Sequence, residues 1–183
     1  MNSRLTARLL AIRPRRFLSG TLLLWAATAC AHDGTVNIDG TILNNTCTIS
    51  SESKNITVPM GMVASKQFYK AGDTTNPIQF SINLENCGSA VSGVDVTFTG
   101  ATDTANKDLL AIDTGTGNAT GLGIALLDQN KTLIPISEPS KQYALTPDAK
   151  SVSLVFFAQY TATGAKVSAG VANATATFTL NYA

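Results

Sequence analysis

The C-terminal segment GVANATATFTLNYA, residues 170–183, alternates between apolar and polar side chains with almost no break. A period of two residues is typical of a β-strand that has one buried and one exposed face. The segment therefore predicts a last strand with no later strand to cover its free edge, although free edges invite aggregation. The apolar row consists of Ala172, Ala174, Ala176, Phe178, Leu180 and Tyr182.

Strand patterns also occur earlier, separated by loops rich in Gly, Ser, Thr, Asn and Asp. The segment SVSLVFFAQY at 151–160 is apolar at both parities in its middle, which is typical of a strand buried on both faces. Helical patterning is confined to 60–70, where Pro59 and Gly61 limit it to a turn or two. These features predict one all-β sandwich domain. The other expected strands are 35–43, 78–84, 94–98 and 123–127.

The first 31 residues have the features of a secretory signal peptide. A basic region precedes the apolar run 17–29, which is too short to span a membrane as a helix, and Ala29-Cys30-Ala31 supplies small residues at the cleavage position. Lipidation of Cys30 and a twin-arginine signal at Arg15-Arg16 stay open as alternatives. The sequence therefore predicts export and a mature chain that begins at His32.

The net charge of the expected mature chain excludes one class of partner. Removing the five arginines of the signal from the 13 basic residues leaves eight lysines against 12 acidic residues, a net charge of −4. A chain without arginine lacks the side chain that holds phosphates with two parallel hydrogen bonds, and no lysine cluster supplies a basic patch. We therefore expect no nucleic acid among its partners.

The residues that carry enzyme chemistry are scarce. His32 is the only histidine, so neither a Ser-His-Asp nor a Cys-His arrangement is available elsewhere, and a tetrahedral zinc site lacks ligands. The Gly-rich stretch at 115–121 is not followed by the Lys-Ser or Lys-Thr pair of a phosphate-binding loop. We therefore expect no enzyme: no catalytic residues, no cofactor, no metal site and no small-molecule substrate.

Cys47 and Cys87 are the two cysteines of the expected mature chain. In an exported chain they are expected to form a single disulfide, and neither has the nearby Cys or His that a metal or redox pair would need. Closing a loop of this length contributes about 3 to 4 kcal/mol in the chain-entropy account.

Distinctive segments occur together: GTVNIDGTILNNTC at 34–47, LENCG at 84–88, AQYTATGAKVSAGVANATATFTLNY at 158–182, and the penultimate Tyr182. In this combination the mature chain resembles the pilin subunits of type 1 fimbriae, which the chaperone-usher pathway assembles. The resemblance implies an incomplete immunoglobulin-like sandwich that lacks its final strand. A donor strand from a chaperone or a neighbouring subunit would complete it. The implied partners are a periplasmic chaperone, an outer-membrane usher and neighbouring pilin subunits, in a homo- or hetero-polymer.

The resemblance also implies roles for particular residues. The segment 35–43 would be the donor strand, in which Val36, Ile38 and Ile42 insert into a neighbour and Gly40 lies where only bare backbone fits. The segment 170–182 would be the groove-edge strand that the chaperone recognises, through Gly170 and the apolar row named above. The implied organisation is a signal peptide at 1–31, an N-terminal extension at 32–46 and a pilin domain at 47–183.

The implied function is a structural subunit of a bacterial surface fimbria that supports adhesion. The chain would pass through the periplasm and polymerise head-to-tail, since such contacts generate open filaments. Only three residues, 32–34, precede the donor pattern, which resembles minor adaptor subunits, so shaft, adaptor and terminator ranks stay open. The alternative is a self-standing secreted carbohydrate-binding adhesin module, for which the mature chain lacks tryptophan because Trp25 lies in the signal.

Overall fold

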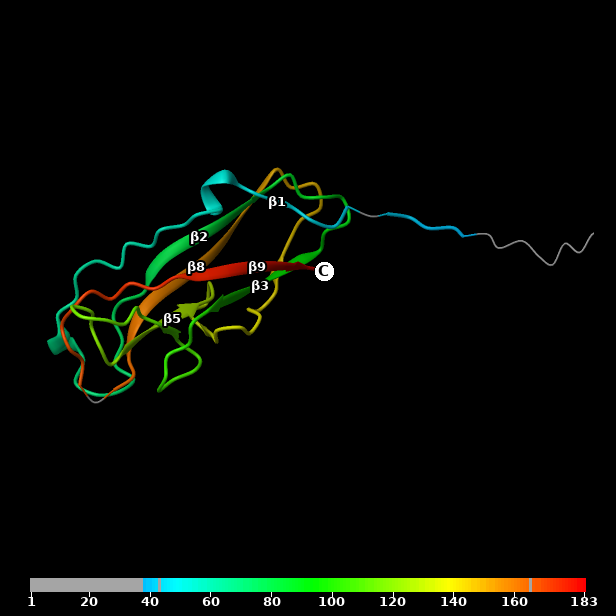
Figure 1. The fold of residues 1–183 in the computed structure, drawn as a ribbon. Coiled ribbons are helices and arrows are strands. Elements are labelled where there is room, and N and C mark those ends of the chain that lie inside the picture. The colour runs from blue at the N-terminus through cyan, green and yellow to red at the C-terminus, as the bar shows by residue number, and fades with distance from the viewer. Residues whose placement is uncertain (1–37, 43, 165) are drawn as a thin grey trace, which may run out of the picture. The chain divides into compact units, whose positions relative to one another are not determined.

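The computed structural model describes residues 38–42, 44–164 and 166–183 (Figure 1). The expected signal peptide at 1–31, together with His32 and Val36, lies outside the described residues. The chain divides into two units, Met1–Gly40 and Thr41–Ala183, and every strand of the structure belongs to the second. The following description concerns that second unit.

The domain is built from two antiparallel sheets. The six-stranded sheet has the order β1-β2-β8-β5-β4, with β6 paired to β5, and the three-stranded sheet has the order β7-β3-β9. Two short 3-10 helices, η1 at Ser51–Ser53 and η2 at Ser65–Gln67, complete the elements. The strands are β1 Thr48–Ile49, β2 Ile78–Glu85, β3 Gly93–Gly100, β4 Leu110–Ala111, β5 Leu122–Leu127, β6 Leu133–Ile134, β7 Tyr143–Ala144, β8 Ser151–Ala162 and β9 Ala176–Tyr182.

The longer strands lie where their sequence patterns predict them. β2, β3, β5 and β8 coincide with the expected strands at 78–84, 94–98, 123–127 and 151–160. The central strand β8 pairs with β2 on one side and β5 on the other, so both of its edges are covered. The strands that the sequence did not predict, β1, β4, β6 and β7, have two residues each, too few to display a period.

The core lies between the two sheets. Phe156 of β8 is completely buried and stacks on Phe80 of β2, with 5.7 Å between the ring centroids. It meets Phe98 of β3 edge-on at 5.2 Å, so one aromatic cluster joins both sheets. On the outer face of the larger sheet, Phe157 packs against the buried Leu127. This second contact explains why the middle of β8 is apolar at both parities.

The structure also tests the predicted disulfide, the predicted helical turn and the predicted first strand. Cys47 and Cys87 form the expected disulfide, with a sulfur–sulfur distance of 2.05 Å. The helical turn expected within 60–70 is confined to η2. Within the expected strand 35–43, the described residues 38–42 form no strand, because no partner strand lies beside them in the described chain.

Candidate functional site

The free edge of β9 is the most unusual feature of the smaller sheet. β9 pairs with β3 along its full length, from Val94 opposite Tyr182 to Gly100 opposite Ala176. On its other edge no ladder is formed by any described strand. The regular strand begins at Ala176, later than the sequence pattern suggests, because 172–175 have no ladder partner. A row of backbone donors and acceptors is therefore available for another strand.

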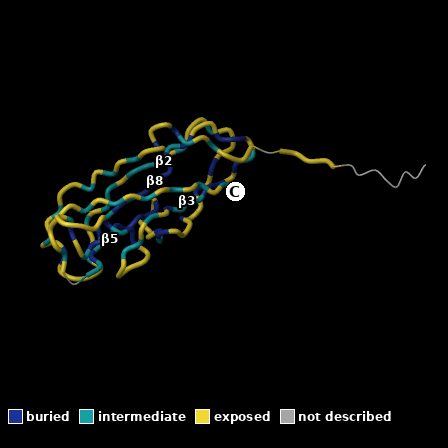
Figure 2. Tube along the Cα trace, in the orientation of Figure 1, coloured by how far each residue is buried: buried dark blue, intermediate teal, exposed yellow. Residues whose placement is uncertain are grey.

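The inward-facing side chains of β9 are only half-buried. Phe178 and Leu180 pack against the core but remain partly exposed, whereas Val96 and Phe98, opposite them on β3, are buried. Figure 2 colours the chain by the burial of each residue. Both strands belong to the same sheet and face the same core, so the difference lies in what covers β9. The same half-burial extends from Ala172 to Tyr182 along every second residue. The apolar row therefore lines an incompletely filled space.

A second extended segment borders this space. Residues 55–63, here called the wall segment, alternate between half-buried Ile56, Val58 and Met60 and exposed residues between them. Within the described chain, the wall segment forms no ladder and no backbone hydrogen bond. The sequence ITVPM at 56–60 carries the same period of two, a signal that the sequence analysis missed because Pro59 interrupts strand patterns. We assign an apolar groove to the space between β9 and the wall segment, because both carry half-buried apolar rows and backbone without a ladder partner on the facing side.

Contacts at each end show that the two borders run antiparallel. At one end the Tyr182 hydroxyl donates to the carbonyl of Cys47, which precedes the wall segment in the chain and is separated from it by β1 and η1, at 3.2 Å. At the other end a cavity of about 430 Å³ is lined by Gly61, Met62 and Val63 from one border. Residues 167–173 line it from the other border. The groove therefore extends over the length of β9 and ends in this cavity.

Gly170 stands at the cavity end of the groove. A Cβ atom added to Gly170 would overlap the backbone of Asn118 and Ala119. Beside it, the Val171 N–H donates to the Gly117 carbonyl at 3.0 Å, and the Ala119 N–H donates to the Val171 carbonyl at 2.9 Å. Only glycine permits this approach of two backbones, which sets the direction in which the chain enters β9.

Three tyrosine hydroxyls connect the two sides of the domain. Tyr143 of β7 donates to the Val155 carbonyl of β8 at 2.9 Å, and Tyr160 of β8 donates to the Ala172 carbonyl at 2.8 Å. Tyr182 makes the third connection, described above. Burial raises the pKa of all three hydroxyls above the ordinary 10.0, because the ionised form loses hydration. The three groups are therefore neutral donors at physiological pH.

The expected donor residues are solvent-exposed where the structure describes them. Ile38 is 90% exposed and Ile42 is 100% exposed, which is unusual for large aliphatic side chains. Gly40 has no atom within 4 Å of the position of a Cβ. Val36 lies outside the described residues. The exposed aliphatic row and the unfilled groove are thus both present in one chain.

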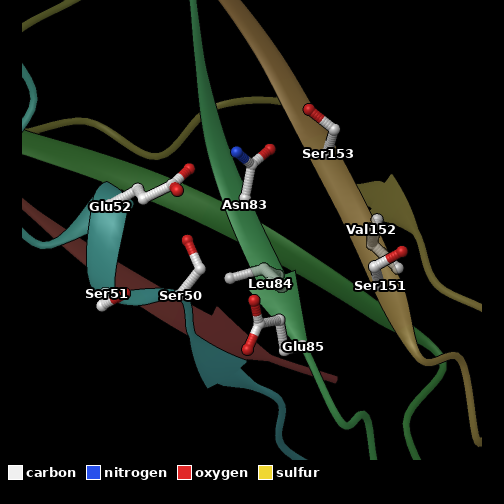
Figure 3. A pocket seen from close by; sticks show the side chains of 9 residues that line it. All are labelled: Ser50, Ser51, Glu52, Asn83, Leu84, Glu85, Ser151, Val152 and Ser153. Carbon is white, nitrogen blue, oxygen red and sulfur yellow. The ribbon is translucent and has the colours of Figure 1, made fainter.

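A polar pocket of about 330 Å³ lies away from the groove, between η1 and the outer face of the larger sheet. Figure 3 shows the carboxylate of Glu52 and the side chains of Asn83 and Ser153 around it. None of its lining residues is aromatic, so it lacks the flat apolar surface that commonly stacks on sugar rings. The lining residues are Ser50, Ser51, Glu52, Asn83, Leu84, Glu85, Ser151, Val152 and Ser153.

Side chains that could bind a metal ion are scattered over the described ranges. No group of three or more His, Cys, Asp or Glu side chains there is placed to hold such an ion. Among the same residues, no helix is long and apolar enough to cross a membrane.

Comparison with known proteins identifies the family. The sequence profile of the family described as fimbrial protein matches residues 36–183. The chain belongs to the fimbrial protein family. An uncharacterised fimbrial-like protein of Escherichia coli strain K12, YcbV, is 44% identical over 166 residues, which cover 91% of this chain and 94% of the relative.

Solved structures of fimbrial proteins have the same fold. The antigen and type I fimbria protein BPSL1626 of Burkholderia pseudomallei is 38% identical, with a TM-score of 0.59 over 74% of this chain and 88% of that protein. A subunit of a chaperone-usher pilus is 25% identical, with a TM-score of 0.63 over 86% of this chain and 100% of that subunit. This fimbrial protein is therefore a structural pilin subunit of an extracellular surface fimbria, with an immunoglobulin-like fold.

Proposed function

We propose that this fimbrial subunit joins its neighbours head-to-tail by donor-strand exchange. The segment 35–43 of one subunit lies in the groove between β9 and the wall segment of the next. Val36, Ile38 and Ile42 face the core, and Gly40 passes close to the acceptor backbone. The observation that carries this proposal is the half-buried apolar row of β9 beside an edge without a backbone partner in the described chain.

The energies are sufficient for such a joint. Burying each large aliphatic side chain contributes about 1.5 to 3 kcal/mol, and each added backbone hydrogen bond contributes about 0.5 to 1.5 kcal/mol net. Association costs about 4 to 15 kcal/mol in lost translational and rotational freedom. Three aliphatic side chains and a ladder along β9 offset a cost of that size. Because donor and groove occupy different parts of the chain, the contact repeats and generates a filament.

The same groove requires protection before assembly. An exposed apolar groove with a free strand edge promotes aggregation, so a periplasmic chaperone covers it until an outer-membrane usher passes the subunit to the fibre. The similarity to a subunit of a chaperone-usher pilus, described above, supports this route. In this proposal residues 1–31 direct export, 32–46 form the extension and 47–183 form the pilin domain.

Gly40→Arg tests the proposal. The added side chain blocks insertion of the donor without touching the groove, since Gly40 has open space around it in the subunit. We expect a soluble chaperone complex at normal level but no polymers that resist sodium dodecyl sulfate before heating.

Asp39→Arg is the matched control, because it places the same side chain one position earlier, on the opposite face of an extended donor. Polymers should form from this variant. Normal polymers from Gly40→Arg would refute donor-strand exchange through this segment.

A further inference from the structure

The N-terminal extension becomes attached to the domain very close to the last donor residue. The Ala90 N–H donates to the Asn44 carbonyl at 3.0 Å, and the Gly88 N–H donates to the Thr46 carbonyl at 2.9 Å. A Cβ at Gly88 would overlap the Asn44 carbonyl, so this loop and the extension are closely packed. The chain is therefore held by its own domain from Asn44 onward.

Only one residue separates this attachment from Ile42. Two residues of fully extended chain span at most about 7 Å. When Ile42 of one subunit lies in the groove of another, Asn44 of the donor subunit must lie within that distance of it. The loop at 88–90 is bonded to Asn44 and moves with it. The two domains are consequently brought into direct contact.

The direction of the donor determines which end of the acceptor is touched. All ladders between the described strands are antiparallel, and antiparallel pairing is slightly the more stable kind per residue. A donor antiparallel to β9 directs Ile42 toward the N-terminal end of the apolar row, which is the cavity end. The reverse direction would bring the donor domain to the Tyr182 end, where the acceptor's own Cys47 already lies.

The cavity end carries exposed apolar side chains that the subunit itself does not cover. Met62 is 104% exposed and Val171 is 53% exposed, and both line the cavity. Among the described residues beyond the donor segment, Tyr69 and Leu133 are the other large hydrophobic side chains with high exposure. Tyr69 follows Phe68, which lines the same cavity. Met62 and Val171 are thus exposed apolar side chains at the cavity that an antiparallel donor would approach with its Ile42 end.

We infer that Met62 and Val171 of one subunit bind the end of a second copy of this chain that carries 44–46 and 88–90. This inference rests on the proposed donor-strand exchange. The contact fixes the orientation of successive domains, because a tether of one residue leaves no room for a hinge between them. The joint of the fibre is therefore a domain–domain interface as well as an inserted strand.

Cysteine crosslinking tests this contact in polymers of the full chain. The double variant Asn45→Cys with Met62→Cys places thiols on the two surfaces, and Cys47 and Cys87 are already bonded to each other. Within one subunit these two positions lie at opposite ends of the groove, so a link between them joins two subunits. A short bis-maleimide should give a ladder of covalent multimers that survives boiling in detergent.

Two controls make the test specific. Asn45→Cys with Lys141→Cys carries the acceptor thiol beside Gly93, at the Tyr182 end of β3, and should give no ladder. Inserting Gly-Ser-Gly-Ser before Asn44 in the Met62 pair should reduce the ladder to the level of that control, while polymers that resist unheated detergent still form.

The outcomes separate the two proposals. Polymers that resist unheated detergent but give no ladder with the Met62 pair would overturn the domain–domain contact and leave donor-strand exchange intact. An equal ladder with the Lys141 pair would also overturn it. Failure of the unmodified chain to polymerise with itself, with the chaperone complex present at normal level, would overturn the contact between two copies of this chain.

Discussion

Gly170 illustrates how the requirement for one residue type depends on the fold. Its place before the alternating row was recognisable in the sequence, but the reason for a glycine there was not. The structure places it against the backbone of Asn118 and Ala119, with no space for a side chain. Those two residues are far from it in sequence and belong to the loop before β5. A requirement of this kind depends on two distant segments meeting, so only the fold reveals it.

Replacing Gly170 by alanine should destabilise the domain. The added methyl group must displace backbone rather than a flexible side chain, and overpacking of this kind costs about 1 to 3 kcal/mol. Urea unfolding of the oxidised chain should show a lower midpoint with an unchanged slope. Gly40→Ala is the control, because the space around Gly40 is open. An unchanged midpoint in Gly170→Ala would contradict the close packing.

At the scale of elements, β9 carries two kinds of contact. Its paired edge forms a ladder with β3, and its inward row closes one side of the core. Its other edge, together with the wall segment, borders the groove. The alternation of residues 172–182 predicted the strand and its two faces. It did not predict that the wall segment would be the opposite border, since hydrogen-bonding partners are chosen by tertiary packing.

Removing residues 178–183 should abolish capture of the subunit. The deletion takes away Phe178, Leu180 and Tyr182, most of the ladder with β3, and the hydrogen bond to Cys47. The remaining domain loses one border of the groove, so a chaperone has no strand to bind and proteases remove the chain. Immunoblots of periplasmic extracts should show little protein.

Thr179→Ser, which changes only the exposed row, should leave the periplasmic amount unchanged. Normal amounts of the truncated chain would argue against recognition through β9.

At the scale of the whole molecule, three tyrosines join parts that no ladder joins. Tyr143 connects the smaller sheet to β8, Tyr160 connects β8 to the segment before β9, and Tyr182 connects β9 to Cys47, the residue before β1. Nothing in their spacing along the sequence suggested a common role. The three tyrosines share this role because the folded sandwich brings each hydroxyl within hydrogen-bonding distance of a carbonyl in another part of the domain.

These tyrosines predict unfolding in alkali. Their folded pKa values lie above the unfolded value of about 10, so the folded state holds its protons more tightly. The resulting stability is fully present below pH 10 and is lost as pH rises through the folded pKa values. Circular dichroism should show the urea midpoint falling steeply in that range.

In Tyr182→Phe the free energy of unfolding at pH 7 should be lower by about 0.5 to 1.5 kcal/mol, which lowers the urea midpoint. The midpoint of this variant should also depend less on alkaline pH. An identical pH dependence in this variant would refute a contribution from Tyr182.

The sequence alone determined the class of fold, the positions of the long strands, the disulfide and the free last strand. These features depend on side-chain periodicity and residue type, which are local properties of the chain. The tertiary structure decided the features that depend on distant segments. They are the wall segment opposite β9, the close approach at Gly170, the cavity at the end of the groove and the attachment at Asn44. Each arises where chain segments meet, and no local pattern specifies which segments those are.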